Sequence, residues 1–151
     1  MEPDRQPTRG EPEEALGSAL DLIGDRWSLL VVSALLEGAH RFADLQQAIP
    51  AIAPNVLSQR LRRLEAGGVV LAEPYSHRPT RYRYRLTATG AELAGAVRLL
   101  TRWGAVHSDP RAGASSGPTH SDCGTPLEVR WWCPTCDQPV DGDGAGPPEF
   151  V

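Results

Sequence analysis

The apolar residues between positions 15 and 66 recur every three or four residues, which is the spacing of amphipathic helices. Asp25 is a good N-cap for the second of these helices, and Pro54 suits the first position of the last one. The inner face of that last helix carries Leu57, Leu61 and Leu64. The pattern therefore predicts four helices, over residues 15–23, 26–37, 42–49 and 54–66.

Residues 69–86 alternate in the manner of β-strands. Gly67-Gly68 closes the preceding helix, and three arginines then alternate with Tyr82, Tyr84 and Leu86 along the second half of the segment. The alternation predicts a hairpin with strands over 69–75 and 81–86 and a tip over 76–80.

A long amphipathic helix is expected over residues 89–107, where Thr89-Gly-Ala-Glu92 fits a capping box. Its stripe is more apolar than the last helix of a monomeric domain of this size needs, and exposed apolar patches usually mark interfaces. We therefore expect a dimer interface made by Leu93, Val97, Leu100 and Trp103.

Together these elements predict an α+β fold that is mainly α. It is a winged helix-turn-helix with a two-stranded wing and a long C-terminal dimerisation helix, followed by a small module that contains the three cysteines. The expected organisation is a disordered arm (1–14), the domain of helices and wing (15–107), a linker (108–119), the module (120–140) and a disordered tail (141–151).

Charge is distributed unevenly along the 151 residues. The net charge is −4, but residues 15–107 carry +4, while residues 1–14 carry −3 and residues 108–151 carry −5. Every basic residue is arginine, and seven of them lie within residues 58–85. The positive charge thus coincides with the last short helix and the hairpin, where contacts to phosphates would need it.

The outward side of helix 54–66 has the residue types that read bases. Asn and Gln bond adenine edges and Arg bonds guanine in the major groove, while a wing rests on the DNA backbone. A solvated helix face is the alternative, because arginine-rich faces are common, but the preceding helix-turn-helix and the following hairpin favour DNA. We therefore expect residues 15–107 to be the DNA-binding and dimerisation domain. The candidate DNA-binding residues are Asn55, Ser58, Gln59, Arg60, Arg62 and Arg63 on the helix and Arg78 and Arg81 on the wing.

Several strings in residues 15–107 resemble those of the HxlR-type regulators, a winged-helix branch related to the MarR type. They are Ala19-Leu-Asp-Leu-Ile-Gly-Asp-Arg-Trp27, Arg41-Phe-Ala-Asp-Leu45, Leu57-Ser-Gln-Arg-Leu-Arg-Arg-Leu-Glu65, the Gly68 turn, Tyr84-Arg-Leu-Thr87 with Gly90, and Arg102-Trp-Gly104. The resemblance implies a homodimer built on the first and last helices that binds a pseudo-palindromic operator and regulates nearby genes. The expected partners are double-stranded DNA, a second copy of the chain and a small-molecule effector.

The sequence departs from that family's pattern at two positions. Many members carry a cysteine just before the first helix, and some use it as a redox sensor, but Glu13-Glu14-Ala15 stands there in this chain. Redox sensing by that cysteine is therefore not carried over. Ala53 stands where Ser or Thr often caps the reading helix, which should weaken the helix start by about 1 kcal/mol.

All three cysteines lie near the C-terminus in a metal-ligand pattern. His120-x2-Cys123 and Cys133-x2-Cys136 bracket nine residues, of which Leu127–Trp132 is β-prone, and Gly124 suits a tight turn after the first pair. The pattern predicts that residues 120–140 are a zinc-ribbon-like module. Its structural Zn2+ site has the expected ligands His120, Cys123, Cys133 and Cys136, with His107 as the alternative fourth ligand. Free thiols, or a relic that has lost its metal, are the other interpretations.

Other classes of protein are less well matched. Residues 1–14 are polar and acidic, unlike a signal peptide, and no run of about 18 apolar residues could span a membrane, so we expect a cytoplasmic protein. The chain has no phosphate loop, nucleophile elbow or His-Glu-x-x-His string, so we expect no enzyme. Two functions remain: a sequence-specific DNA-binding regulator, with repression the expected sign, or an interaction module whose zinc ribbon recruits a partner while the winged helix is a scaffold. Salt-dependent DNA binding separates them.

Overall fold

The computed structural model describes residues 11–108, 119–125, 127 and 130–140. They divide into two units at Val97 and Arg98, and each unit is described by itself. Most of the expected arm, linker and tail lies outside the described residues.

Four helices build the first unit: α1 (Glu11–Ile23), α2 (Arg26–Leu35), α3 (Phe42–Ala48) and α4 (Pro54–Ala66). Asp25 is the N-cap of α2, as the sequence predicts, and its carboxylate accepts hydrogen bonds from the backbone of Trp27 and Ser28. The expectation of a disordered arm up to residue 14 is wrong for its last part, because α1 begins at Glu11. Glu13-Glu14-Ala15 therefore lies inside α1 and not before it.

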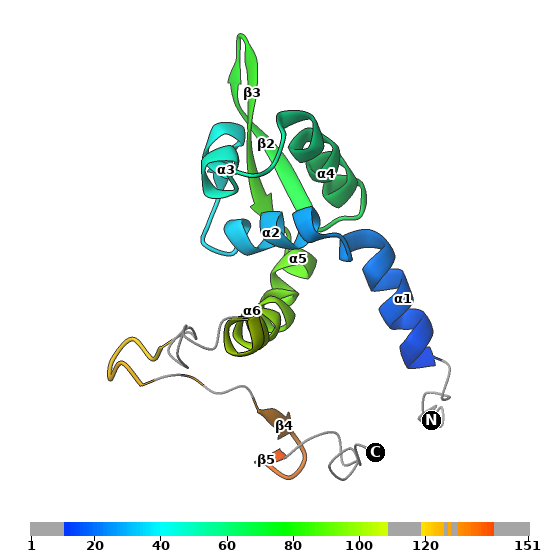
Figure 1. Cartoon of the computed structure of the whole chain (residues 1–151), viewed down its shortest axis with the longest axis vertical. Helices are drawn as coiled ribbons and strands as arrows, with labels where there is room; N and C mark the ends of the chain where they lie inside the picture. The colour runs from blue at the N-terminus through cyan, green and yellow to red at the C-terminus, as the bar shows by residue number, and fades with distance from the viewer. Residues whose placement is uncertain (1–10, 109–118, 126, 128–129, 141–151) are drawn as a thin grey trace. The chain divides into compact units, whose positions relative to one another are not determined.

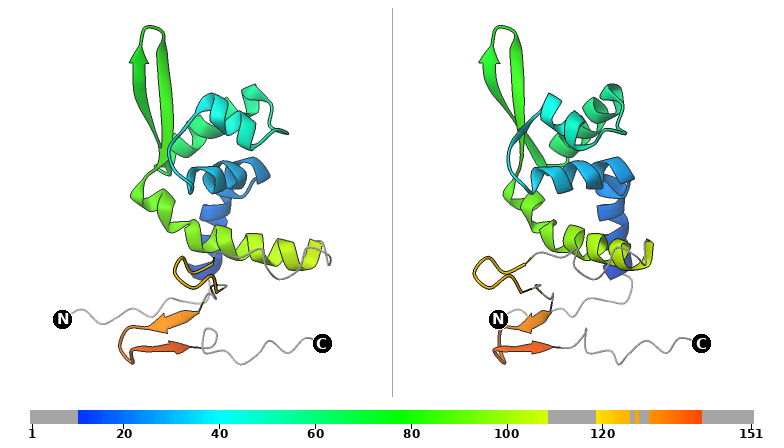
Figure 2. Two further views of the ribbon diagram at one scale, coloured as in Figure 1. Left: turned by 90° about the vertical axis from the view of Figure 1, so that its left-hand side faces the viewer. Right: turned by 60° about the vertical axis from the view of Figure 1, so that its left-hand side comes forward.

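The wing is the hairpin of β2 (Val70–His77) and β3 (Thr80–Leu86), which projects beyond α3 and α4 (Figures 1 and 2). Both strands reach further than the sequence predicts, so that only Arg78-Pro79 separates them. A short strand that the pattern missed, β1 (His40–Arg41), pairs with β3 and gives an antiparallel sheet of order β1-β3-β2.

Strand β2 contains a bulge at Tyr75. Pro74 pairs with Tyr82 and Ser76 pairs with Arg81, so Tyr75 is the extra residue. Proline has no N–H to give to a ladder, and an inserted residue bends its strand and turns its side chain to a new direction. Tyr75 is thereby placed at the base of the wing.

The long helix expected after the wing is divided into α5 (Ala88–Glu92) and α6 (Ala94–Ser108). The expected capping box at Thr89 is wrong: the N-cap is Thr87, whose hydroxyl accepts from the Gly90 N–H at 3.0 Å. The same hydroxyl donates to the Gly68 carbonyl at 2.6 Å, which ties the start of α5 to the turn before β2.

The core of the first unit is a cluster of aliphatic side chains from α2, α3, α4 and the base of the wing. Leu93 packs against this cluster and Val97 is part of it, so these two residues of the expected dimer stripe are committed to the core. On α2, Leu30 is 40% exposed, whereas Val32 is fully buried. The cluster consists of Val31, Val32, Leu35, Leu45, Ile49, Ile52, Leu57, Leu61, Leu64, Val69, Val70 and Val97.

The second unit contains a small hairpin. Strand β4 (Trp131–Cys133) pairs antiparallel with β5 (Gln138–Val140), with Cys133 opposite Gln138. The expected strand over 127–132 is strand only from Trp131 among the described residues. Within the described ranges, no helix is both long and apolar enough to cross a membrane.

Candidate nucleic-acid interface

Helix α4 has one buried and one exposed face. Leu57, Leu61 and Leu64 are buried, as the sequence predicts, whereas Asn55, Gln59 and Arg62 are exposed and Ser58 is half-buried. Ala53 gives no side-chain cap, and Pro54 at the first position begins the helix with its restricted φ.

Arg60 of α4 has an intramolecular partner. Its Nε lies 3.2 Å from Oδ1 of Asp25, in an ion pair without the geometry of a hydrogen bond. Burial raises the pKa of Asp25, but hydrogen bonds from Ser28 and Trp27 and the charge of Arg60 outweigh it and bring that pKa below its ordinary value. Arg60 therefore joins α4 to the N-terminus of α2.

Arg63 also reaches back into the protein. Its guanidinium donates to the backbone carbonyl of Asp21 in the last turn of α1. A cation at the C-terminal end of a helix satisfies a free carbonyl and complements the helix dipole. Both arginines were expected to contact DNA, and in the structure both hold α4 against the α1–α2 junction.

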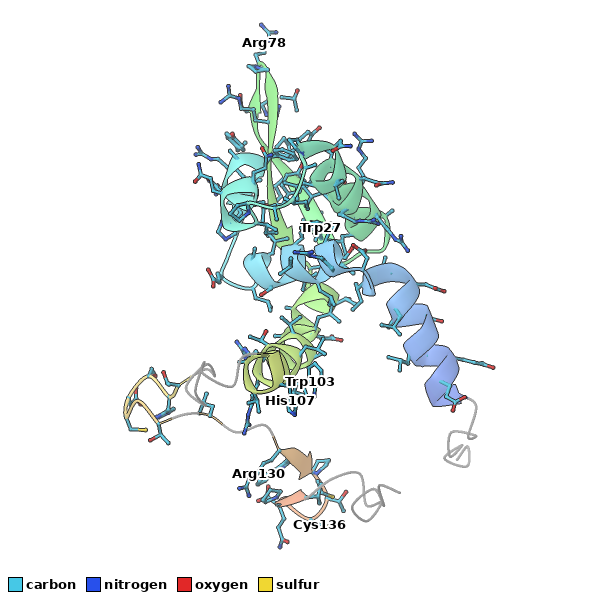
Figure 3. All side chains as sticks on the ribbon, in the orientation of Figure 1. Trp27, Arg78, Trp103, His107, Arg130 and Cys136 are labelled. Carbon is cyan, nitrogen blue, oxygen red and sulfur yellow. The ribbon has the colours of Figure 1, made fainter. Side chains whose placement is uncertain are left out.

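The wing carries exposed arginines. Arg78 lies at its tip (Figure 3), and Arg81 lies on β3 directly after the turn. Arg85, further down the strand, donates to Glu73 at 2.7 Å, so its charge is paired across the sheet. Of the expected DNA-binding residues, α4 and the wing thus present Asn55, Gln59, Arg62, Arg78 and Arg81 to solvent, while Arg60 and Arg63 have partners inside the protein.

A groove of about 370 Å3 lies between α4 and the wing, and Ser58, Arg62 and Glu65 line one side of it. Tyr82 and Tyr84 line the other side. Burial, followed by the negative charge of Glu65, raises the pKa of Tyr84, so its phenol remains a neutral hydrogen-bonding group.

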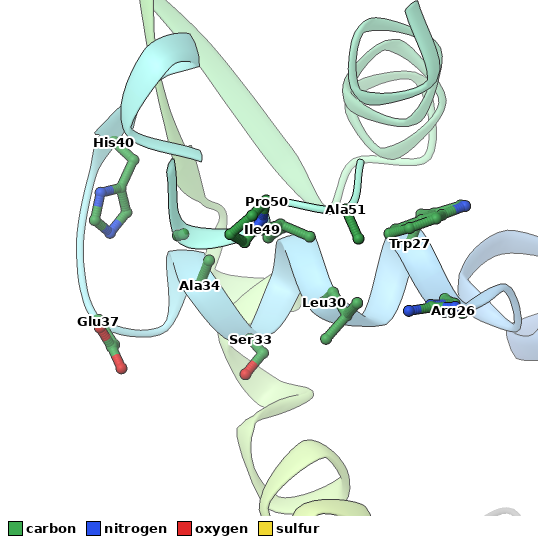
Figure 4. Close-up of a pocket in the computed structure, with 11 residues that line it drawn as sticks. Arg26, Trp27, Leu30, Ser33, Ala34, Glu37, His40, Ile49, Pro50 and Ala51 are labelled. Atoms are coloured by element: carbon green, nitrogen blue, oxygen red, sulfur yellow. The ribbon is translucent and has the colours of Figure 1, made fainter. Parts of the chain in front are cut away.

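A separate hollow of about 440 Å3 runs along α2 beneath the turn between α3 and α4 (Figure 4). Trp27, Leu30 and Ile49 are among its apolar walls. Arg26 stands at one end, stacked on the Trp27 ring with its guanidinium carbon 4.5 Å from the ring centroid. His40 also lines the hollow, and its buried Nε2 has no hydrogen-bond partner among the residues that the structure describes.

The two expected ligand pairs form separate turns in the second unit. In the first turn, His120 Nδ1 lies 3.3 Å from Cys123 Sγ, and Gly124 adopts φ +70°. In the second turn, between β4 and β5, the backbone N–H groups of Cys136 and Thr135 hold the pKa of the Cys133 thiol below its ordinary value. Hydrogen bonds from Thr125 likewise lower the pKa of Cys123.

The structure does not bring the four expected ligands together. Among the described residues, no three His, Cys, Asp or Glu side chains lie where they could share a metal ion. The alternative ligand His107 stacks on Trp103 with ring centroids 5.0 Å apart, and its Nδ1 lies 2.9 Å from the Trp103 carbonyl.

The comparison with protein families decides the identity of the DNA-binding unit. The model described as HxlR-like helix-turn-helix matches residues 22–112, which is more than half of the chain. The chain belongs to the HxlR-like helix-turn-helix family. The matched residues include the helices and strands of the winged helix from α2 onwards and the whole of α6.

Relatives of this HxlR-like protein are named as regulators. An uncharacterized HTH-type transcriptional regulator of Mycobacterium tuberculosis is 34% identical over 134 residues, covering 89% of this chain and 84% of the relative. The uncharacterized HTH-type transcriptional regulator YvaP of Bacillus subtilis is 37% identical over 92 residues, covering 61% of this chain and 85% of the relative. The family and these relatives make the chain a DNA-binding transcriptional regulator.

A solved structure supports the fold. The redox regulator HypR in its oxidized form has a TM-score of 0.59 and 32% identity, and the match covers 63% of this chain and 98% of that one.

The similarity to the mycobacterial relative covers more of this chain than the similarity to HypR or the family match does. An aligned stretch of 134 residues in a chain of 151 must include residues 18–134, wherever it begins. That similarity therefore extends into the cysteine-containing segment.

Sequence reasoning missed the internal partners of this HxlR-like unit. Asp25 was recognised as a cap, and a carboxylate at an N-cap near an arginine-rich helix is a signal for an ion pair. The bond from Arg63 to the Asp21 carbonyl has no such signal, because a backbone carbonyl is the same at every position.

Proposed function

We propose that this regulator binds a pseudo-palindromic operator as a homodimer and represses transcription there. The observation that carries the proposal is the exposure of Asn55, Gln59 and Arg62 on α4, beside a wing that projects with Arg78 at its tip. Helix α4 enters the major groove and the wing follows the backbone, so that a dimer occupies two half-sites and blocks access to the promoter. The alternative, in which the winged helix is only a scaffold, is disfavoured by the family match.

Base-reading and phosphate-binding residues have different effects on specificity. Gln59→Ala or Arg62→Ala should weaken the operator by about 1–3 kcal/mol per substitution and relax preference among operator variants. Arg78→Gln or Arg81→Gln should weaken operator and scrambled DNA by similar factors. Quantitative gel shifts on the intergenic region beside the gene measure both.

Glu37→Gln, an exposed change in the turn after α2, is the matched control and should leave DNA binding unchanged. Unaltered binding by all four arginine and glutamine variants would refute the assignment of α4 and the wing.

The dimer is proposed to form through apolar side chains that the described residues leave exposed. Four such side chains lie on α6 and two lie on α1, and each of them is more than two-fifths exposed to solvent. Burying such groups against a second copy is favourable by about 25 cal/mol per Å2. The residues are Leu16, Leu20, Leu99, Leu100, Trp103 and Val106.

We also infer that residues 120–140 bind one Zn2+ through His120, Cys123, Cys133 and Cys136. Thiolates and imidazole suit zinc, and each pair already sits in a tight turn with hydrogen bonds to sulfur. The similarity with the mycobacterial relative, which extends into this segment at least as far as residue 134, supports a folded role for it. A segment of this size has too little core to fold without a staple, so the metal would draw the two turns together.

Metal analysis of protein purified under reducing conditions should find one zinc per chain. Cys133→Ser should abolish it without moving the thermal midpoint of the winged helix, while Thr135→Ala, between the two cysteines, should retain it. Wild-type protein without zinc would reject the site.

The expected small-molecule effector is proposed to bind in the hollow along α2. Its apolar walls, the cation of Arg26 and the unpartnered Nε2 of His40 suit a flat, partly polar molecule. Ala34→Trp, which fills the hollow, should remove any thermal shift caused by such a ligand. A ligand-induced thermal shift that persists in Ala34→Trp would exclude the hollow as the effector site.

A further inference from the structure

We propose that a second groove, between the start of α3 and the base of the wing, is a clamp for one backbone phosphate of bound DNA, with Arg41 as its principal cation. The inference rests on the proposed function and adds a contact to it. The groove has a volume of about 500 Å3, and Arg41 and Arg81 both line it. Neither the reading face of α4 nor the wing tip includes Arg41.

Both the backbone and the side chain of Arg41 are held in place by contacts within the protein. Its backbone N–H donates to the Asp44 carboxylate at 2.8 Å, at the start of α3, and β1 pairs it with Arg83 of β3. Its guanidinium lies over the Tyr75 ring, 4.8 Å from the centroid. A guanidinium stacked on an aromatic ring keeps its N–H groups directed outward, because the stacking uses only the face of the ion.

Tyr75 reaches Arg41 because of the bulge in β2. It is the residue inserted between Pro74 and Ser76, and its side chain is 40% exposed. Bulges frequently re-aim a side chain at a functional surface. Here the bulged residue Tyr75 supports Arg41, which is the N-cap of α3, and so connects the wing with α3.

The groove has the charge and the donors that a phosphate diester requires. Arg41 and Arg81 supply two cations, and Thr80 and the tyrosines supply hydroxyl groups. The single carboxylate lining it, Asp44, already accepts the Arg41 N–H. Phosphate contacts of this kind position a protein on the duplex without reading its sequence.

Arg41→Gln tests the clamp directly. Compared with the wild type, the variant should bind a duplex from the intergenic region beside the gene, and a scrambled duplex of equal length, more weakly by similar factors. The slope of log K against log salt should fall by about 0.9, the value for one lost phosphate contact, so that between 50 and 200 mM salt the wild type loses about threefold more affinity than the variant. Tyr75→Leu, which keeps the charge but removes its support, should weaken both duplexes without lowering the slope by a full contact.

Arg85→Gln is the matched control, because Arg85 is also an arginine of the small sheet but its charge is already paired with Glu73. It should leave the slope unchanged. A wild-type slope in Arg41→Gln, with Arg78→Gln still impaired, would overturn the clamp and leave the proposed function standing. If the wild type binds neither duplex, the proposed function and the clamp fail together.

Discussion

At the scale of single residues, Asp25 has more roles than its position in the sequence indicates. It caps α2, accepts the buried Ser28 hydroxyl at 2.6 Å and pairs with Arg60 of the reading helix. Its role as a cap follows from the sequence, because local hydrogen bonds need only neighbouring residues. The pairing with Arg60 depends on how α4 packs on α2, and the helical spacing alone cannot give that.

Asp25→Ala should lower the free energy of unfolding by about 2–3 kcal/mol, since it removes a cap and leaves the buried Ser28 hydroxyl without its acceptor. Asp25→Asn keeps an acceptor for the cap and should cost about 1 kcal/mol at pH 7. Chemical denaturation measures both. Asp21→Asn is the control, because Arg63 bonds the backbone of that residue, and it should change stability by less than about 0.5 kcal/mol.

The pH dependence of the same position follows from its lowered pKa. A carboxylate whose pKa is lower in the folded protein stabilises it above the unfolded pKa, and loses that effect as pH falls through the folded pKa. The difference in stability between wild type and Asp25→Asn should therefore be constant near neutral pH and shrink below about pH 4. A difference that persists unchanged at pH 2–3 would show that the charge of Asp25 contributes nothing.

At the scale of elements, the helices with strong periodicity were predictable and the connections were not. The bounds of α4 agree with the sequence prediction, since three leucines and Pro54 define it locally. The break between α5 and α6 was missed, because it comes from contacts to residues far away in the chain. Thr87 bonds the Gly68 carbonyl, and a Cβ on Gly90 would lie 2.1 Å from the Val69 carbonyl oxygen.

Gly90→Ala should therefore destabilise the protein by about 2–3 kcal/mol, because the methyl group meets backbone that cannot move aside without shifting β2 or α5. Gly17→Ala is the matched control: it also lies in a helix, and its Cβ would meet nothing within 4 Å. It should stabilise by up to about 1 kcal/mol. Thermal unfolding of the two variants gives the comparison, and equal midpoints would contradict the close approach at Gly90.

At the scale of the whole molecule, the winged helix could be predicted from the sequence. The structure then shows which of the predicted surface residues are exposed and which belong to the core. The apolar stripe of the last helix looks uniform in sequence, but the core takes Leu93 and Val97 and leaves Leu100 and Trp103 exposed. The four proposed metal ligands are evident as a pattern in the sequence, but the structure places them in two separate turns, and among the described residues no three such side chains could share a metal ion. Function was predictable because DNA-reading chemistry needs residue types and spacing that a sequence carries directly.

Leu100→Asp should convert the proposed dimer to a monomer at micromolar concentration, because it puts a charge into the proposed apolar interface, and operator affinity should fall with it. Light scattering measures the mass. Leu71→Asp, the same change at an exposed leucine of the wing, should leave the dimer intact. A wild-type monomer, or a dimer that survives Leu100→Asp, would remove α6 from the interface.

We infer that α4 and the wing make this chain a sequence-specific DNA-binding regulator. The most direct measurement is the affinity of the protein for a duplex from the intergenic region beside the gene and for a scrambled duplex across 50–200 mM salt. We predict a steep loss of affinity with salt for both duplexes and a preference for the intergenic one of at least about 1000-fold, the lower end for specific regulators. Equal affinities for the two duplexes, or binding that does not respond to salt, would contradict it.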